Sequence, residues 1–190
     1  MSLLLTGKRV LILGFFFRNN LGDDTYVYVF DRLLRGADVG QLTFVSMDDL
    51  QPQHVCDADV VICGGGDIIN DYFIRKLLRV EKLLLSKPCY AVSVGIAYAH
   101  DARLVDVFDH VYVRSSACMD LAAGRRVPVT LMPDLAFALS PPPPPAAGAA
   151  DQKYNLAVCL AQPVFRARPE LLKSMAQAII ATAESLAMMA

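Results

Sequence analysis

The segment 60–76, VVICGGGDIINDYFIRK, joins a short apolar run to three consecutive glycines and then to a polar segment. The run VVIC is rich in β-branched residues, which is typical of a strand buried on both faces of a parallel sheet. We predict that this strand ends at Gly64–Gly66, where the absence of side chains lets a ligand or another backbone approach closely. The triplet lacks the spacing of a dinucleotide-binding GxGxxG motif or of a Walker A loop. Asp67 and Asp71 follow it as acceptors for sugar hydroxyls, or as a base.

Similar apolar runs recur on both sides of this segment. They are RVLILGFF (9–16), QLTFVSM (41–47), PCYAVSVG (88–95), HVYVRS (110–115) and VTLMPD (129–134). Segments of helical length separate them, at 23–36, 71–87 and 115–124, with Gly36 as a C-cap and Ser115 or Ser116 as an N-cap. Alternation of this kind predicts an α/β domain over residues 1–139, built as a doubly wound Rossmann-like parallel sheet.

The sequence changes character after this domain. Residues 140–152, SPPPPPAAGAADQ, have the composition of an extended Pro/Ala-rich linker. Residues 153–190 then predict one strand, YNLAVCLA, and one helix, with Pro169 in its first turn. A single strand–helix arm cannot bury enough surface to fold alone, so we interpret it as the truncated start of a second domain. We expect the arm to dock on the first domain or on a partner subunit, which would give a homo- or hetero-oligomer.

Composition excludes several classes of protein. The 190 residues carry a formal net charge of −1, which argues against nucleic-acid binding. No apolar stretch reaches the ~18 residues of a membrane-spanning helix, so we predict no transmembrane segment and a cytoplasmic protein. The five cysteines are widely spaced and include no CxxC pair. They predict buried free thiols in a reducing compartment, with no disulfide frame and no metal site.

Polar residues and glycines cluster where the predicted strands end, which is the edge at which doubly wound sheets bind ligands. After the first strand, Asn20, Gly22 and Asp23 predict a tight turn whose N–H groups favour an anionic or hydroxyl-rich ligand. Alternatively, Asp23 or Asp24 merely caps the next helix. We predict that this turn and Gly64–Gly66 bind substrate.

The later strand ends add four more candidates. Gly95 and His100 follow the fourth strand, and His100 is a candidate acid–base group or an ordinary loop residue. Arg114 ends the fifth strand as a clamp for a carboxylate or phosphate, or as the partner of a neighbouring Asp. Asp134 follows the sixth strand. We take Asp71, His100 and Arg114 as catalytic candidates, and Gly95 and Asp134 as substrate-binding residues.

Taken in order, these motifs resemble the polysaccharide pyruvyl transferase family. The resemblance rests on NLGDD (20–24), DVVICGGGDIIND (59–71), VSVGI (92–96), VYVRSS (111–116) and PDLAFAL (133–139). It implies half of a two-domain, glycosyltransferase-B-like architecture. It also implies transfer of an enolpyruvyl unit from phosphoenolpyruvate to hydroxyls of a saccharide or glycan-lipid acceptor, giving a cyclic pyruvate ketal and phosphate without a cofactor. The residues implied for the acceptor side are Asn20, Gly22, Asp23, Gly64, Gly65, Gly66 and Asp71, and those for the cleft floor are Gly95, Arg114 and Asp134.

The sequence also departs from this family pattern. Ser115 stands where the family often has Asp, and Cys118 stands where it often has Ser. Beyond the linker only Arg166 and Arg168 are available as donor-binding cations. Two hypotheses therefore stay open: an enzyme whose catalytic half lies elsewhere, or a non-catalytic binding and assembly module whose arm docks on a partner subunit.

Overall fold

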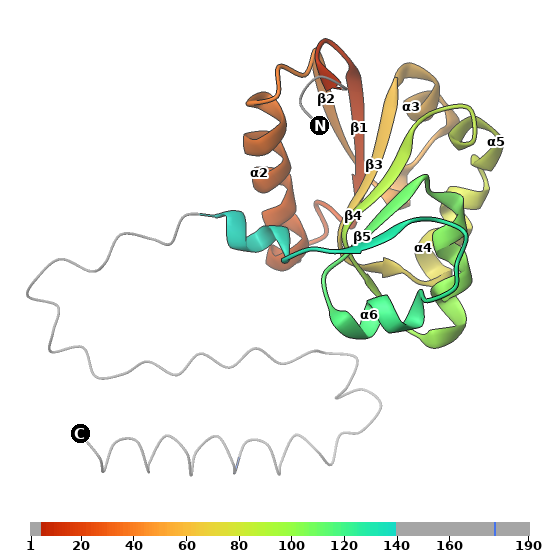
Figure 1. Ribbon diagram of the computed structural model, residues 1–190. Helices are drawn as coiled ribbons and strands as arrows, with labels where there is room; N and C mark the ends of the chain where they lie inside the picture. The colour runs from red at the N-terminus through yellow and green to blue at the C-terminus, as the bar shows by residue number, and fades with distance from the viewer. Residues whose placement is uncertain (1–4, 140–176, 178–190) are drawn as a thin grey trace, which may run out of the picture. The chain divides into compact units, whose positions relative to one another are not determined.

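The computed structural model describes residues 5–139 and residue 177, and residues 5–139 contain a six-stranded sheet. The strand order is β2-β1-β3-β4-β5-β6, and every neighbouring pair is parallel (Figure 1). The predicted doubly wound α/β sheet is therefore confirmed. The strands are β1 Arg9–Gly14, β2 Gln41–Ser46, β3 Val60–Ile69, β4 Cys89–Ile96, β5 His110–Val113 and β6 Val129–Leu131. The predicted linker 140–152 and the arm 153–190 lie outside the described residues, apart from residue 177.

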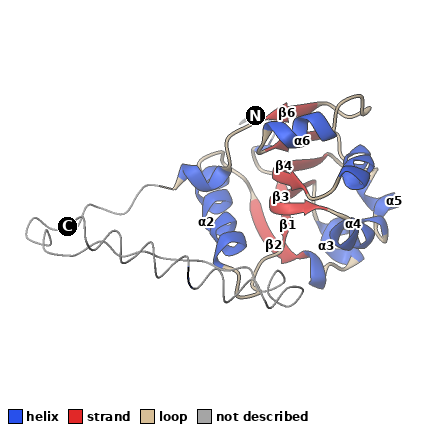
Figure 2. Ribbon diagram, turned by 90° about the horizontal axis from the view of Figure 1, so that it is seen from below, coloured by secondary structure: helices blue, strands red, loops and turns tan. Residues whose placement is uncertain are grey.

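The two faces of the sheet are covered unequally, as Figures 1 and 2 show. Helix α2 (Leu21–Arg35) packs on one face, over a core that includes Ile12 and Ile62. The opposite face is covered by the shorter helices and holds the larger core, which includes Leu11 and Leu13. Those helices are α3 Pro52–Asp57, α4 Asp71–Leu78, α5 Glu81–Leu84 and α6 Ser116–Leu121. The domain also contains three 3-10 helices, which are η1 Met47–Asp49, η2 Ala99–Val107 and η3 Leu135–Ala138.

The strand order fixes where a ligand would bind. The chain leaves β1 in one direction to form β2 and then crosses to form β3 on the other side of β1. The loops at the carboxyl ends of β1 and β3 therefore lead to opposite faces of the sheet, which makes this the topological switch point, the usual ligand site of this topology. The turn at 15–20 and the last residues of β3 lie at this switch point.

The prediction that the third strand ends at the glycine triplet is wrong. β3 continues to Ile69, with φ of 78° at Gly65 and 79° at Gly66. Its pairing with β4 shifts register between Gly66 and Ile69. Because glycine adopts positive φ without a steric cost, the strand bends at this point and still continues.

Helix α2 is the group that approaches the glycines closely. A Cβ atom at Gly64 would overlap the ring of Phe30, and one at Gly65 would overlap the ring of Tyr26. At Gly66 it would lie 2.6 Å from the Oδ1 atom of Asp23. The three helix residues, 23, 26 and 30, share one face of α2 because they are three and four positions apart. Glycine is required here because the helix lies directly on the strand.

Other sequence predictions are confirmed or corrected in detail. Ser115 caps α6 by accepting a hydrogen bond from the N–H of Cys118. The predicted helix 71–87 is broken into α4 and α5 at Val80, whose φ of −116° and ψ of 16° lie outside the helical region. Three of the four described cysteines are buried, and Cys56 is exposed. No helix among residues 5–139 is long and apolar enough to cross a membrane.

The packing of α2 on β3 predicts a large cost for adding one methyl group. Gly65→Ala should destabilise the fold by about 2–4 kcal/mol, because the new Cβ meets the Tyr26 ring and the backbone keeps a positive φ. Gly124→Ala is the matched control, with φ of 77° and no atom within 4 Å of the added Cβ, and it should cost only ~1–2 kcal/mol. Urea unfolding measures both. Equal losses would contradict the close contact between α2 and β3.

Candidate active site

Arg114 is the centre of a polar cluster at the carboxyl edge of the sheet. It follows β5, and its Nη2 atom donates to Asp67 Oδ1 at 2.8 Å. Its Nη1 atom donates to Asp134 Oδ2 at 3.0 Å. Asp67 lies near the end of β3 and Asp134 follows β6, so one guanidinium joins three strand ends. Paired hydrogen bonds of this kind hold a planar guanidinium in a fixed orientation.

Asp134 is held by four donors. Tyr26 Oη donates to its Oδ1 atom at 2.7 Å, and the N–H of Ala136 donates to the same atom at 2.9 Å. Ser93 Oγ lies 3.4 Å from Oδ1, and Arg114 binds Oδ2. Burial raises the pKa of Asp134, but the hydrogen bonds from Ala136, Tyr26 and Arg114 outweigh it, so the pKa lies below its ordinary value. Asp134 is therefore a fixed anion.

The same contacts change the pKa of Tyr26 and of Arg114. Burial and the nearby Asp134 carboxylate raise the pKa of Tyr26, so its hydroxyl keeps its proton. Burial lowers the pKa of Arg114, but the hydrogen bonds to Asp67 and Asp134 outweigh this and raise it. Both groups therefore stay hydrogen-bond donors.

The surroundings of Asp23 raise the pKa of its carboxyl group. Burial, together with the charges of Asp24 and Asp67, raises the pKa of Asp23 to about 6, although the charge of Arg114 lowers it. Asn20 Nδ2 donates to Asp23 Oδ2, and Asp23 Oδ1 faces Gly66. A carboxyl group with this pKa can exchange a proton with a ligand near neutral pH.

The Asn20–Asp23 turn itself is a helix cap. Asn20 is the N-cap of α2, because its Oδ1 atom accepts from the N–H of Gly22 at 3.1 Å. The alternative in which Asp23 or Asp24 caps this helix is therefore wrong. The cap leaves Asp23 free to point toward β3, and in this way the turn joins the edge that carries Arg114.

Gly95 is the glycine that lets the cluster close over β4. A Cβ atom at this position would collide with Asp67 Oδ1 and lie 3.4 Å from Arg114 Nε. Ser93, two residues earlier, is fully buried with a φ of 59°, and its Oγ atom accepts from the N–H of Leu135 at 3.0 Å. The pairing of β4 with β5 shifts register at this serine. The VSVG segment therefore supports both Asp67 and Asp134.

Two predicted catalytic residues lie apart from the cluster. Asp71 is in the first turn of α4 and forms an ion pair with Arg75 one turn later. His100 is an exposed residue of η2, stacked on Tyr98 with 5.5 Å between ring centroids. Within the described part of the chain, neither side chain makes a hydrogen bond or ion pair with the cluster. Their catalytic roles stay predictions that no contact supports.

Three members of the site were not among the predicted site residues: Tyr26, Asp67 and Ser93. Asp67 was noted as an acceptor next to the triplet. Tyr26 shares a helix face with Asp23 at a spacing of three, which is a signal that the sequence does carry. Ser93 carries none, since its role depends on a positive φ that favours other residue types.

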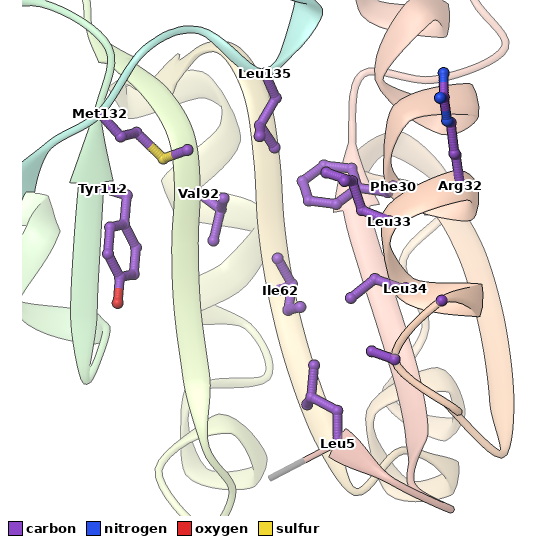
Figure 3. A pocket seen from close by; sticks show the side chains of 12 residues that line it. Leu5, Phe30, Arg32, Leu33, Leu34, Ile62, Val92, Tyr112, Met132 and Leu135 are labelled. Atoms are coloured by element: carbon purple, nitrogen blue, oxygen red, sulfur yellow. The ribbon is translucent and has the colours of Figure 1, made fainter. Parts of the chain in front are cut away.

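An apolar groove of about 600 Å³, distinct from the polar cluster, lies beside α2 on the face of the sheet that α2 covers (Figure 3). Its lining includes Phe30, Val92 and Leu135, and Leu135 follows Asp134 directly. Among residues 5–139, Arg32 is the one charged residue that borders it. A phosphorylated or hydroxyl-rich ligand needs polar partners, so the groove does not fit such a ligand and the cluster does.

The fold and the cluster together define an α/β domain with a polar cluster at the carboxyl edge of its parallel sheet, the edge at which folds of this class usually bind ligands. The family model for polysaccharide pyruvyl transferase matches residues 5–186, which is nearly the whole chain. The chain therefore belongs to the polysaccharide pyruvyl transferase family. No curated protein matches it.

The raised pKa of Asp23 predicts a pH dependence of stability. Its pKa is about 6 in the folded chain and 3.8 without the fold, so between these values the folded state keeps a proton that the unfolded chain releases. Stability should therefore fall as the pH rises from about 4 to about 6, by ~1–2 kcal/mol once solvent screening of this half-buried group is allowed for. Asp23→Asn removes this loss.

Urea unfolding of both proteins across this pH window measures the effect. The stability of Asp23→Asn relative to the wild type should increase steadily as the pH rises and level off above about 6. A difference that stays constant over the window would mean that Asp23 titrates as an ordinary surface carboxyl group.

Proposed function

We propose that this domain binds the saccharide acceptor of a pyruvyl transfer reaction in polysaccharide synthesis, with phosphoenolpyruvate as the donor. The observation that supports it is the charge balance of the cluster. One cation, Arg114, faces three carboxyl groups, those of Asp23, Asp67 and Asp134. An excess of acceptors repels an anionic donor and suits a neutral ligand rich in hydroxyl groups.

The exposure of the three acidic residues separates their roles. The Asp67 side chain is 63% exposed, and Arg114 binds only its Oδ1 atom, which leaves Oδ2 for a sugar hydroxyl. The Asp134 side chain is 22% exposed and is held by its four donors, so it orients Arg114 and Tyr26. Asp67 is thus the residue that contacts the acceptor, and Asp134 positions its neighbours.

Asp23 is the group that takes the proton of the attacking hydroxyl. In the overall reaction, two hydroxyls of one sugar form two C–O bonds to C2 of the donor, and the C–O bond to phosphate breaks. One of the two hydroxyl protons is balanced by the proton gained at the methylene carbon, and the other leaves with the phosphate. Above pH 6 Asp23 is ionised and can accept the first of these protons.

Several expectations from the sequence, on the donor site, the oligomer, the acceptor and the location, stay proposals. The cations that would bind the donor phosphate and carboxylate are expected beyond residue 139, outside the described domain. An oligomer formed through residues 153–190, a glycan-lipid as the acceptor and a cytoplasmic location stay predictions. So does the assignment of Gly64, Gly65 and Gly66 to substrate binding, since α2 already accounts for their close packing.

Phosphate release from phosphoenolpyruvate in the presence of pyranose oligosaccharides tests this function. Asp23→Asn should lower the rate by ~10²–10⁴-fold, the usual contribution of a general base. The wild-type rate should rise with pH up to about 6, and the Asp23→Asn rate should lack this rise. Asp31→Asn is the matched control, since Asp31 lies on the same helix and pairs with Arg35 on the exposed surface.

Two outcomes would count against catalysis by Asp23. Equal rates for Asp23→Asn and Asp31→Asn would remove Asp23 from the mechanism. Saccharide binding without any phosphate release would favour the alternative, in which the domain is a non-catalytic binding module.

A further inference from the structure

Three consecutive phenylalanines follow β1, and only the last faces solvent. Phe16 is fully buried, and Phe15 packs on Phe73 with 5.4 Å between ring centroids. Phe17 is 60% exposed, and its ring meets the buried ring of Phe16 edge-on, with 6.2 Å between ring centroids. Exposing a large ring beside an available core works against folding.

The backbone of Phe17 is strained as well. Its φ is 61°, which is a conformation that bulky side chains rarely adopt. Its N–H donates to Asp24 Oδ1 at 2.6 Å, so the first turn of α2 holds it in this state. Strained residues that are fixed by their surroundings cluster at ligand contacts, so this outlier points to a functional role for Phe17.

The position of Phe17 connects it with the acceptor cluster. It lies in the loop at the carboxyl end of β1, at the switch point between β1 and β3. Asp24, which holds its backbone, is next in sequence to Asp23, and Asp23 faces Gly66 of β3. The ring therefore lies in a loop at the same carboxyl edge of the parallel sheet as Asp67, which is near the end of β3.

We propose that the ring of Phe17 is a stacking platform for a pyranose ring of the acceptor glycan. This proposal rests on the proposed function, because it assigns the apolar contact of the same acceptor site. The C–H face of a pyranose is apolar and can cover an aromatic ring, while its hydroxyls project from the rim. A sugar stacked on Phe17 would direct those hydroxyls toward the acidic cluster.

The composition of the chain allows a direct measurement. The sequence contains no tryptophan, so Phe17→Trp places the only indole at the proposed platform. Its fluorescence should change when pyranose oligosaccharides of gluco, galacto or manno configuration bind, with the same midpoint as wild-type binding. Leu85→Trp is the control, since Leu85 is 71% exposed and precedes β4 at the opposite edge of the sheet. Its emission should not change.

A second pair of variants separates the ring from the backbone strain. Phe17→Gly removes both, and Asn19→Gly relaxes a φ of 57° in the same loop without removing a ring. Phe17→Gly should weaken saccharide affinity by about tenfold or more, whereas Asn19→Gly should leave it unchanged. Both variants should unfold at a urea concentration no lower than that of the wild type.

The outcomes distinguish this proposal from the function on which it rests. Wild-type saccharide binding with equal affinity in Phe17→Gly would overturn the platform and leave the function intact. The proposal would also be overturned if the emission of unliganded Phe17→Trp is blue-shifted and does not change when saccharide is added. That result would show that the protein itself covers the ring. Absence of saccharide binding by the wild type would overturn both.

Discussion

The contact between helix α2 and the glycines of β3 determines the position of everything else in the candidate site. Asp23, Tyr26 and Phe30 lie on Gly66, Gly65 and Gly64, with no side chain between helix and strand. This contact brings the Asp23 carboxyl group and the Tyr26 hydroxyl to the carboxyl edge of the sheet. There Tyr26 reaches Asp134, which comes from the far end of the domain. A helix held further from the strand would leave both groups short of the cluster.

Arg114 then holds the carboxyl groups of Asp67 and Asp134 together at the edge of the sheet. Without a cation, the charges of Asp67 and Asp134 would repel each other and would favour protonation of one of them. The guanidinium joins them through separate nitrogen atoms and fixes their distance. Asp23 makes no ion pair with it and lies partly buried near like charges, so its pKa rises while that of Asp134 falls. Opposite shifts within one cluster give one carboxyl group for proton exchange and another for structure.

The sequence predicted the fold well because the strands are short, continuous apolar runs with helices between them. It also predicted that something passes close to Gly64–Gly66, but it named a ligand or backbone where the structure has Tyr26 and Phe30. That contact joins residues about 40 positions apart, and no local pattern encodes it. Asp71 and His100 were chosen for their residue types and their place after a strand. The structure gives them local partners instead, since Asp71 pairs with Arg75 one turn later and His100 stacks on Tyr98.

The glycine contact also limits how this site can vary among proteins with the same fold. A helix that rests on bare backbone has almost no freedom to slide or to tilt, since any added atom on β3 would displace it. Under the proposed function, differences in acceptor preference would therefore arise from the loop between β1 and α2. In that sense the contact on β3 separates a part of this edge that cannot move from a loop that is open to change.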